Sequence, residues 1–298
     1  MHSPQNVQYI DRKSGKLVAE SVMGDKALRF AYNTLLGRTL WPILFGGRMV
    51  SALMGRYYDS AVSRRSIAGL TQIPGCRVDE AEFPPETYSS FNAFFARHLR
   101  PGARPFDADG NIIISPADGR LLVFPECVAD SPVPVKGAQR TIGELCLTPL
   151  PFERAAVAVI RLAPVDYHRY HFPCQCTMGE KKVFPGKYHS VNPVALCRRP
   201  DLFVENTRHV TALDSVAAGS FFMIEVAAFG VGSIIATAMP GEHAKMDEKG
   251  YFKFGGSTVI LVFDRDRVTF DDDLLKNSAS GIETLVRCGE RIAEAVKI

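Results

Sequence analysis

The sequence predicts an α+β protein in which an N-terminal helical part packs on a mostly antiparallel β domain. Between about residues 25 and 100, apolar residues recur at three- and four-residue spacing, as in amphipathic helices. Beyond Pro105, short runs rich in β-branched and aromatic residues alternate with glycine and proline turns, which is typical of antiparallel sheet. The 298 residues, 46% of them hydrophobic, can form one large or two modest domains. We expect a helical subdomain over 1–105 and a β-rich domain over 106–298.

The expected elements follow from these patterns. Helices are predicted over 26–36, 48–67, 89–100 and, near the C-terminus, 281–296. Strands are predicted over 112–114, 121–124, 155–160, 221–227, 233–237 and 258–263. Gly255 and Gly256 separate two β-rich runs and predict a hairpin turn, because glycine readily adopts the positive φ that a tight turn needs.

Composition limits the classes of function. The net charge of +3 is too small to indicate a nucleic-acid partner, and no basic platform with interleaved aromatic residues is present. Seven scattered cysteines favour free thiols in a reducing compartment. The first residues lack the charged and apolar regions of a secretory signal, and the apolar stretch over 39–54 is too short to span a bilayer.

The cationic helical part allows two interpretations. Its apolar face can pack against the rest of the protein, or it can dock on an anionic lipid surface as an interfacial element. Several apolar residues lie among arginines there, as a lipid-docking surface requires: Trp41, Leu44, Phe45, Met49, Leu53 and Met54.

Three stretches hold polar residues that a β scaffold does not need, and they carry Asp118, the pair His168 and His171, and Ser257. The two histidines could bind zinc, but a His-Glu-x-x-His pattern and a third ligand cluster are absent, so no metal is expected. An Asp, a His and a Ser brought together by the fold can form a charge relay. The Gly-x-Ser-x-Gly elbow of serine hydrolases does not occur.

Ser257 directly follows two glycines at the start of a predicted strand. Its hydroxyl could therefore reach the carbonyl of Gly256, its own preceding peptide bond. A glycine tolerates the strained geometry of such an attack better than a residue with a side chain. This arrangement favours self-cleavage between residues 256 and 257.

Four stretches, taken in order, resemble the motif set of phosphatidylserine decarboxylases. They cover residues 115–119 (SPADG), 166–171 (DYHRYH), 186–193 (GKYHSVNP) and 250–258 (GYFKFGGST). The resemblance extends from about residue 90 to the end of the chain. Gly-Ser-Thr alone would be a weak signal, whereas four motifs in the order of the family are specific.

The resemblance implies a pyruvoyl-dependent enzyme that makes phosphatidylethanolamine and CO2. Asp118 would orient His171, and His171 would deprotonate Ser257 for attack on the Gly256 carbonyl. The chain would split into two fragments, and Ser257 would become a pyruvoyl group that forms a Schiff base with the substrate amine. His168 would hold the substrate carboxylate or protonate the carbon that loses it.

The resemblance also suggests how the remaining motif and the partners fit. His189, Ser190 and Asn192 would line the substrate site, with a structural role for their loop as the alternative. The expected partners are phosphatidylserine, an anionic membrane surface and the two fragments of the same chain, and a homodimer is left open. The expected location is the cytoplasmic face of the cell membrane, bound peripherally.

The chain departs from the family in one place. The family usually shows Asn-Glu-Arg after the third motif, whereas residues 205–208 read Glu-Asn-Thr-Arg, which leaves the role of this segment open. Two other functions also stay open at this point. One is a pyruvoyl decarboxylase of a soluble amine-bearing substrate, and the other is a non-enzymatic lipid-binding β module that remains one intact chain.

Overall fold

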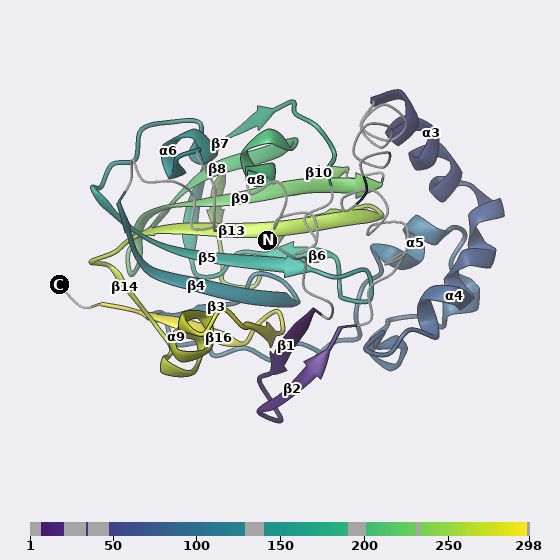
Figure 1. The fold of residues 1–298 in the computed structure, drawn as a ribbon, viewed down its shortest axis with the longest axis horizontal. Coiled ribbons are helices and arrows are strands. Elements are labelled where there is room, and N and C mark those ends of the chain that lie inside the picture. The colour runs from purple at the N-terminus through teal and green to yellow at the C-terminus, as the bar shows by residue number, and fades with distance from the viewer. Residues whose placement is uncertain are drawn as a thin grey trace.

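The structure is a computed structural model that describes residues 7–20, 34, 48–128, 140–189, 201–230 and 233–296. In this part of the chain, one large and two small sheets are accompanied by short helices (Figure 1). The large sheet has ten strands in the order β11-β7-β8-β9-β13-β5-β4-β15-β1-β2. Its neighbouring strands run antiparallel except β1 and β15, which are parallel. The predicted α+β class with a mostly antiparallel sheet is therefore confirmed.

All six predicted strand runs coincide with observed strands. The large sheet contains β1 (Gln8–Asp11), β2 (Lys16–Ala19), β4 (Gly119–Val128), β5 (Arg154–Leu162), β7 (Cys176–Phe184), β8 (Arg208–Ser215), β9 (Gly219–Gly230), β11 (Gly241–His243), β13 (Gly255–Asp264) and β15 (Glu283–Val286). The small sheets are β10 (Ile234–Ala236), β12 (Glu248–Phe252) and β6 (Arg169–His171), and β14 (Val268–Phe270), β16 (Arg291–Ala295) and β3 (Ile112–Ile114).

The helices are short. They are α3 (Arg48–Asp59), the 3-10 helices η1 (Ala61–Ser66), η2 (Val78–Glu80) and η3 (Pro85–Thr87), and α4 (Ile67–Thr71), α5 (Phe91–Phe95), α6 (Ile142–Cys146), α8 (Leu202–Glu205) and α9 (Asp272–Ala279). The helix predicted over 48–67 is thus α3 followed by η1, and the one over 89–100 shortens to α5. Ser90 caps α5 by accepting a hydrogen bond from the Ala93 amide at 3.1 Å. The helix predicted over 26–36 lies outside the described residues.

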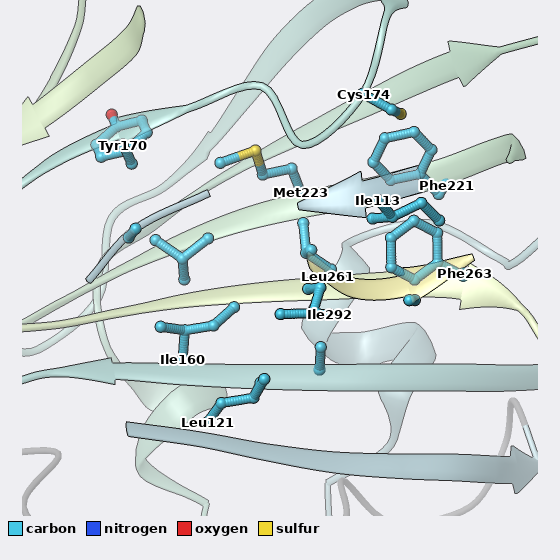
Figure 2. Packing of buried hydrophobic residues seen from close by; sticks show 14 of the residues in the cluster. Ile113, Leu121, Ile160, Tyr170, Cys174, Phe221, Met223, Leu261, Phe263 and Ile292 are labelled. Carbon is cyan, nitrogen blue, oxygen red and sulfur yellow. The ribbon is translucent and has the colours of Figure 1, made fainter. Parts of the chain in front are cut away.

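Both faces of the large sheet are buried. The inner core lies between the large sheet and the two small sheets, where Leu121, Ile160 and Leu261 meet Ile113 and Ile292 (Figure 2). The opposite face forms an outer core against α6 and α8. Strand β13 lies near the middle of the sheet, so its side chains alternate between the two cores. This double burial explains why the run over 258–263 is apolar at almost every position.

The hairpin predicted at Gly255 and Gly256 is wrong. Strand β12 precedes the two glycines but pairs with β10 and β6, whereas β13 pairs with β5 and β9. The chain therefore passes from a small sheet to the large sheet at this point. Two β-rich runs flanking glycines indicate two strands, but they do not determine whether those strands pair with each other.

The helix predicted over 281–296 is also wrong, because this segment forms β15 and β16. Its apolar residues match helical spacing, yet Gly289 between the strands has a φ of 89°. A Cβ at Gly289 would lie 2.7 Å from the carbonyl oxygen of Pro105. This left-handed turn interrupts any helix, and the flanking residues pair with β4 and β3 instead. The helix in this region is α9, which the sequence reading did not predict.

The helical part has an aromatic core of its own. Phe91, Phe94 and Phe95 of α5 pack with Ile67 and Leu70 of α4, and with residues of the loop that follows β5. Figure 1 shows α3, α4 and α5 gathered at one end of the large sheet, where β13 begins. The two strands β1 and β2, although N-terminal, belong to the large sheet.

Candidate active site

Ser257 is the first inward-facing residue of β13. It lies opposite Leu162 of β5 on one side and Ala227 of β9 on the other. Its side chain is fully buried, and its Oγ has no hydrogen-bond partner among the described residues. A buried polar group without a partner costs about 1–3 kcal/mol. Thr258 Oγ1, on the same strand, is also buried without a partner among the described residues, so what distinguishes Ser257 is its position directly after two glycines.

The peptide bond before Ser257 lies at an irregular start of the strand. Pairing with β5 begins at Ser257, and pairing with β9 shifts its register between Gly255 and Ser257. Gly255 has a φ of 153°, a conformation that side chains rarely adopt. Gly256 thus lies at the register shift between Gly255, whose φ only glycine adopts readily, and the regular ladder that begins at Ser257.

His168 lies in the loop that follows β5, the strand paired with Ser257. The carboxylate of Asp166 fixes this loop by accepting hydrogen bonds from the Ala163 amide, at 2.6 Å, and from Arg120. His168 Nδ1 donates to the Asp166 carbonyl at 2.9 Å, because a carbonyl oxygen can only accept. The other nitrogen, Nε2, is therefore unprotonated, and in the described chain it has no partner.

The surroundings of His168 keep it neutral. The ring of Phe95 covers it, with centroids 3.8 Å apart, and burial lowers the pKa of His168 to about 3. The His168 carbonyl accepts a hydrogen bond from the Phe252 amide at 2.9 Å, which joins this loop to the strand that leads to Gly256. His168 is thus a neutral base at physiological pH, attached to the segment that carries the predicted cleavage site.

His171 has partners on both ring nitrogens. Nδ1 donates to the Met246 carbonyl at 2.9 Å, so Nε2 accepts the hydrogen bond from the Tyr167 hydroxyl, at 3.1 Å. The His171 amide donates to the Pro116 carbonyl at 2.8 Å, which places the histidine beside the loop that carries Asp118. Burial lowers the pKa of His171, although the bond to Met246 and the charge of Asp118 oppose this effect.

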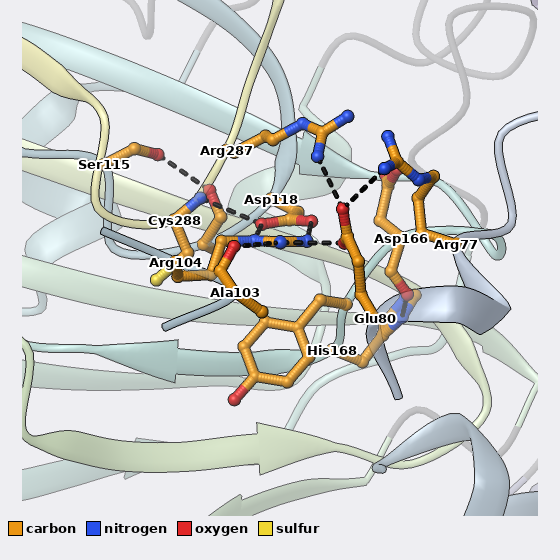
Figure 3. A network of polar contacts seen from close by, with 12 residues as sticks. Arg77, Glu80, Ala103, Arg104, Ser115, Asp118, Asp166, His168, Arg287 and Cys288 are labelled. Atoms are coloured by element: carbon orange, nitrogen blue, oxygen red, sulfur yellow. Dashed lines mark hydrogen bonds and ion pairs between the residues drawn. The ribbon is translucent and has the colours of Figure 1, made fainter. Parts of the chain in front are cut away.

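Asp118 is held by other groups than His171. Arg104 donates to both carboxylate oxygens, at 2.9 and 2.6 Å, and the Cys288 amide donates to one of them at 2.9 Å. Arg104 also binds Glu80 at 2.8 Å (Figure 3). No hydrogen bond between Asp118 and His171 occurs in the described residues. Burial has the largest effect on the pKa of His171 and lowers it; the charges of Glu248 and, to a smaller extent, Asp118 raise it.

Comparison with known proteins assigns the chain to a family. The sequence profile of the family described as phosphatidylserine decarboxylase matches residues 91–294. A phosphatidylserine decarboxylase proenzyme of Ruminiclostridium cellulolyticum is 37% identical over 97% of this chain and 98% of the relative. One of Chlamydia pneumoniae is 38% identical over 98% of both chains, and one of Desulfitobacterium hafniense is 38% identical over 96% and 97%. The chain belongs to the phosphatidylserine decarboxylase family.

The third family motif adjoins the same site through Asn206. His189 is buried, and its amide and carbonyl bind the Asn206 side chain at 3.0 and 2.8 Å. Asn206 also donates to the carbonyl of Ala227, the residue opposite Ser257, at 2.9 Å. Ser190 and Asn192, the other residues predicted to line the site, lie outside the described residues.

Several residues that position the site were not predicted from the sequence. Arg104, Tyr167 and Met246 contact the predicted catalytic residues directly. Tyr167 lies within the second motif, residues 166–171, but was given no role, and Arg104 and Met246 carry no sequence signal that separates them from ordinary loop residues. Asn206 could have been found from the sequence. In residues 205–208, which depart from the Asn-Glu-Arg pattern of the family, it is one of the two family residues that this chain keeps. The other, Arg208, is buried and donates to the carbonyls of Leu145, Val204 and Glu144.

Acid is expected to destabilise this family member through His168. The folded-state pKa of about 3 lies below the unfolded value near 6.5, so between these values only the unfolded chain binds the proton. The free energy of unfolding should therefore fall by about 2 kcal/mol between pH 7 and pH 5 from this group alone. Urea unfolding of an uncleaved Ser257→Ala chain measures the change. His168→Gln in that background should reduce it, and an unchanged pH dependence would contradict the prediction.

Two further findings bear on binding. Within the described ranges, no helix is long and apolar enough to cross a membrane. The same residues contain no group of three or more His, Cys, Asp or Glu side chains placed to hold a metal ion.

Proposed function

We propose that the chain is a proenzyme that cleaves itself between Gly256 and Ser257 and then decarboxylates phosphatidylserine to phosphatidylethanolamine and CO2. The observation that carries this proposal is the buried Ser257 hydroxyl, which lacks a partner in the described part of the chain and follows two glycines at the head of β13. Membership of a family whose relatives are named proenzymes supports it.

In the cleavage that we propose, Ser257 Oγ attacks the carbonyl carbon of Gly256. The C–N bond breaks, the nitrogen takes up a proton, and an ester links Gly256 to the serine oxygen. Loss of the α-proton of Ser257 then expels Gly256 as a carboxylate, and water releases the nitrogen as ammonia. The large fragment ends at Gly256, and the small fragment begins with a pyruvoyl group.

We assign the first proton transfer to His171. Its Nε2 is unprotonated and accepts a hydrogen bond from the Tyr167 hydroxyl. This hydrogen bond must break before Nε2 can accept the proton of Ser257. The imidazolium that forms would be stabilised by Asp118 acting through space, while the Met246 carbonyl fixes the ring. Asp118 thus contributes charge rather than orientation to the proposed relay.

Position 257 suits a pyruvoyl group. It faces the inner core, is excluded from solvent, and is held by backbone pairing to β5 and β9. When present, a pyruvoyl ketone supplies the electron sink that decarboxylation requires. The unpartnered Nε2 of His168 is an acceptor as it stands, so it would first take up a proton, such as the one that the substrate ammonium loses when the Schiff base forms. We propose that the protonated Nε2 then holds the substrate carboxylate or protonates the carbon that loses it. We retain His189, Ser190 and Asn192 as the proposed lining of the substrate site.

The N-terminal part, residues 1–105, is proposed to dock peripherally on the cytoplasmic face of the cell membrane through its helices, since β1 and β2 belong to the large sheet. The side chains of Leu53, Tyr57 and Val62 are exposed on α3 and η1, and Arg56, Arg64 and Arg65 are exposed among them. Apolar side chains within a cationic surface favour the interface of an anionic bilayer. The other predicted docking residues over 41–49 have no described side chains.

Mass spectrometry under denaturing conditions, combined with a vesicle assay, tests the function. The purified protein should give two fragments, residues 1–256 and 257–298, with the small fragment carrying a pyruvoyl group. CO2 should be released from phosphatidylserine vesicles, and the protein should sediment with them more than with phosphatidylcholine vesicles.

Each alternative predicts a different result. A single chain of 32.8 kDa with intact Ser257 would indicate a non-enzymatic module. Two fragments with CO2 release only from soluble amines would indicate a soluble substrate. If the protein cleaved itself and turned over substrate but showed no preference for anionic vesicles, only the proposed docking of residues 1–105 would be contradicted.

A further inference from the structure

The segment before the proposed cleavage site needs an external anchor. Strand pairing with both β5 and β9 fixes Ser257 and the residues after it. On the amino side, Gly255 pairs with Gly230 of β9 alone, and the register shifts between Gly255 and Ser257, at Gly256. Glycine has more backbone freedom than any other residue, so two in a row leave the scissile carbonyl poorly placed unless the chain is also held on their amino side. The structure contains contacts that can do this at Phe254.

The Phe254 side chain is packed among aromatic rings of the helical part. Its ring centroid lies 4.6 Å from Tyr58 of α3, and 4.9 and 5.3 Å from Phe91 and Phe95 of α5. Phe95 in turn covers His168. Phe254 therefore joins α3 and α5 to the residues just before the scissile bond, and Figure 1 shows α5 beside the start of β13.

The backbone of Phe254 is held by Asn92, a buried residue of α5. Asn92 Oδ1 accepts the hydrogen bond of the Phe254 amide at 2.9 Å, and Asn92 Nδ2 donates to Asp59 Oδ1 at the end of α3, also at 2.9 Å. The amide orientation is forced, because a backbone N–H needs an acceptor and a carboxylate needs a donor. The other Asp59 oxygen accepts from Lys253 Nζ at 2.8 Å.

Strand β12, which precedes this segment, is anchored as well. Lys249 Nζ lies 2.7 Å from Glu225 of β9 and 3.1 Å from the Thr211 hydroxyl, and both charged side chains are buried. Breaking a buried ion pair by removing one partner is strongly destabilising, because the remaining charge is left buried without a partner. The chain from Lys249 to Phe254 is thus fixed, so the two glycines span a short distance between two held ends.

We propose that Asn92 and Asp59 are positioning residues for self-cleavage, which hold Phe254 so that the Gly256 carbonyl lies where Ser257 can attack it. This inference rests on the proposed function, because it concerns the same cleavage. It assigns to the helical part a role in maturation besides any contact with lipid. Neither residue is expected to exchange protons or to touch the substrate.

The test is the rate of cleavage in the full-length chain, followed by pulse-labelled synthesis and denaturing gels. Asn92→Ala should slow fragment formation by about tenfold or more, since a small misplacement of reacting atoms costs up to about 100-fold. Asn92→Asp keeps the acceptor for Phe254 but places two carboxylates together, so it should also be slow. In the double variant with Asp59→Asn, the amide at position 59 can donate a hydrogen bond to the carboxylate at position 92. The double variant should therefore cleave faster than Asn92→Asp alone.

Two controls separate positioning from general stability. Asn277→Ala removes a comparable side-chain hydrogen bond, at 3.0 Å to Thr284, far along the chain in α9 and should cleave at the normal rate. Thermal unfolding of each substitution in an uncleavable Ser257→Ala chain reports the stability that is lost. Normal cleavage of Asn92→Ala, or a double variant no faster than Asn92→Asp, would overturn the proposal. If the unsubstituted chain never cleaved, the proposed function itself would fail instead.

Discussion

Ser257→Ala is expected to leave one chain of 32.8 kDa that neither forms fragments nor releases CO2 from phosphatidylserine vesicles. Alanine removes only the hydroxyl, which is both the proposed nucleophile and the source of the pyruvoyl group. Because Oγ has no hydrogen-bond partner in the described residues, its loss should not destabilise the fold and should raise the free energy of unfolding slightly. Denaturing mass spectrometry and a vesicle assay give the two readouts.

Ser220→Ala is the matched control for this experiment. Ser220 also lies on a strand of the large sheet, but its hydroxyl binds Asp214 at an exposed turn, so cleavage and turnover should be unaffected. Two fragments from Ser257→Ala would show that the chain breaks without this hydroxyl. Decarboxylation by the uncleaved chain would show that the activity does not depend on the proposed group.

Substitutions of the two histidines are expected to block different steps, cleavage for His171 and decarboxylation for His168. His171→Gln should leave an uncleaved proenzyme, because glutamine cannot accept the Ser257 proton, and Asp118→Asn should strongly slow the same step. His168→Gln should mature into two fragments but lose a factor of about 100 to 10,000 in kcat, the usual contribution of general acid–base catalysis. Gel analysis and kcat per cleaved molecule distinguish the two effects.

His98→Gln, an exposed position, should behave as the unsubstituted protein in both assays. If His168→Gln failed to mature, His168 would also serve the cleavage, as its open Nε2 permits. If His171→Gln matured fully, the proposed base would be wrong. Either result would identify which of the two buried imidazoles reaches Ser257.

The six strand runs that were predicted could be read from the sequence because their local composition is strongly apolar and β-branched, whereas strands such as β7, β8, β15 and β16 were not predicted. The run over 258–263 is apolar at nearly every position, and the structure buries it on both faces. What the sequence could not show was the choice of partner. The β12 and β13 runs flank two glycines as a hairpin would, yet they pair in different sheets. Similarly, the apolar residues of 281–296 recur at helical spacing. The segment nevertheless forms two strands, because Gly289 has a positive φ and because its two halves pair with β4 and β3.

The candidate site was predictable only where a residue type implies chemistry. Asp118, His168, His171 and Ser257 were predicted from motifs, and the structure buries all four. In the described residues, no hydrogen bond joins the Ser257 hydroxyl to any of the other three. The hydrogen bonds that they make with other residues were not predictable. Arg104 donates to Asp118, and Met246 and Tyr167 occupy the two ring nitrogens of His171, so these contacts stand where a direct one was expected. Such partners depend on tertiary packing and leave no local pattern.

Because β13 lies near the middle of the large sheet, cleavage before Ser257 would change folding from a process of one chain to one that needs two fragments to associate. Once the chain is cut before Ser257, the small fragment supplies this strand, and both of its neighbours, β5 and β9, belong to the large fragment. The same fragment supplies β15 and β16, which pair with β4 and β3. The proenzyme can refold as a first-order process, whereas separated fragments must first meet, and their recovery then depends on concentration. After such a cut, the lifetime of the active protein would depend on how slowly the two fragments separate.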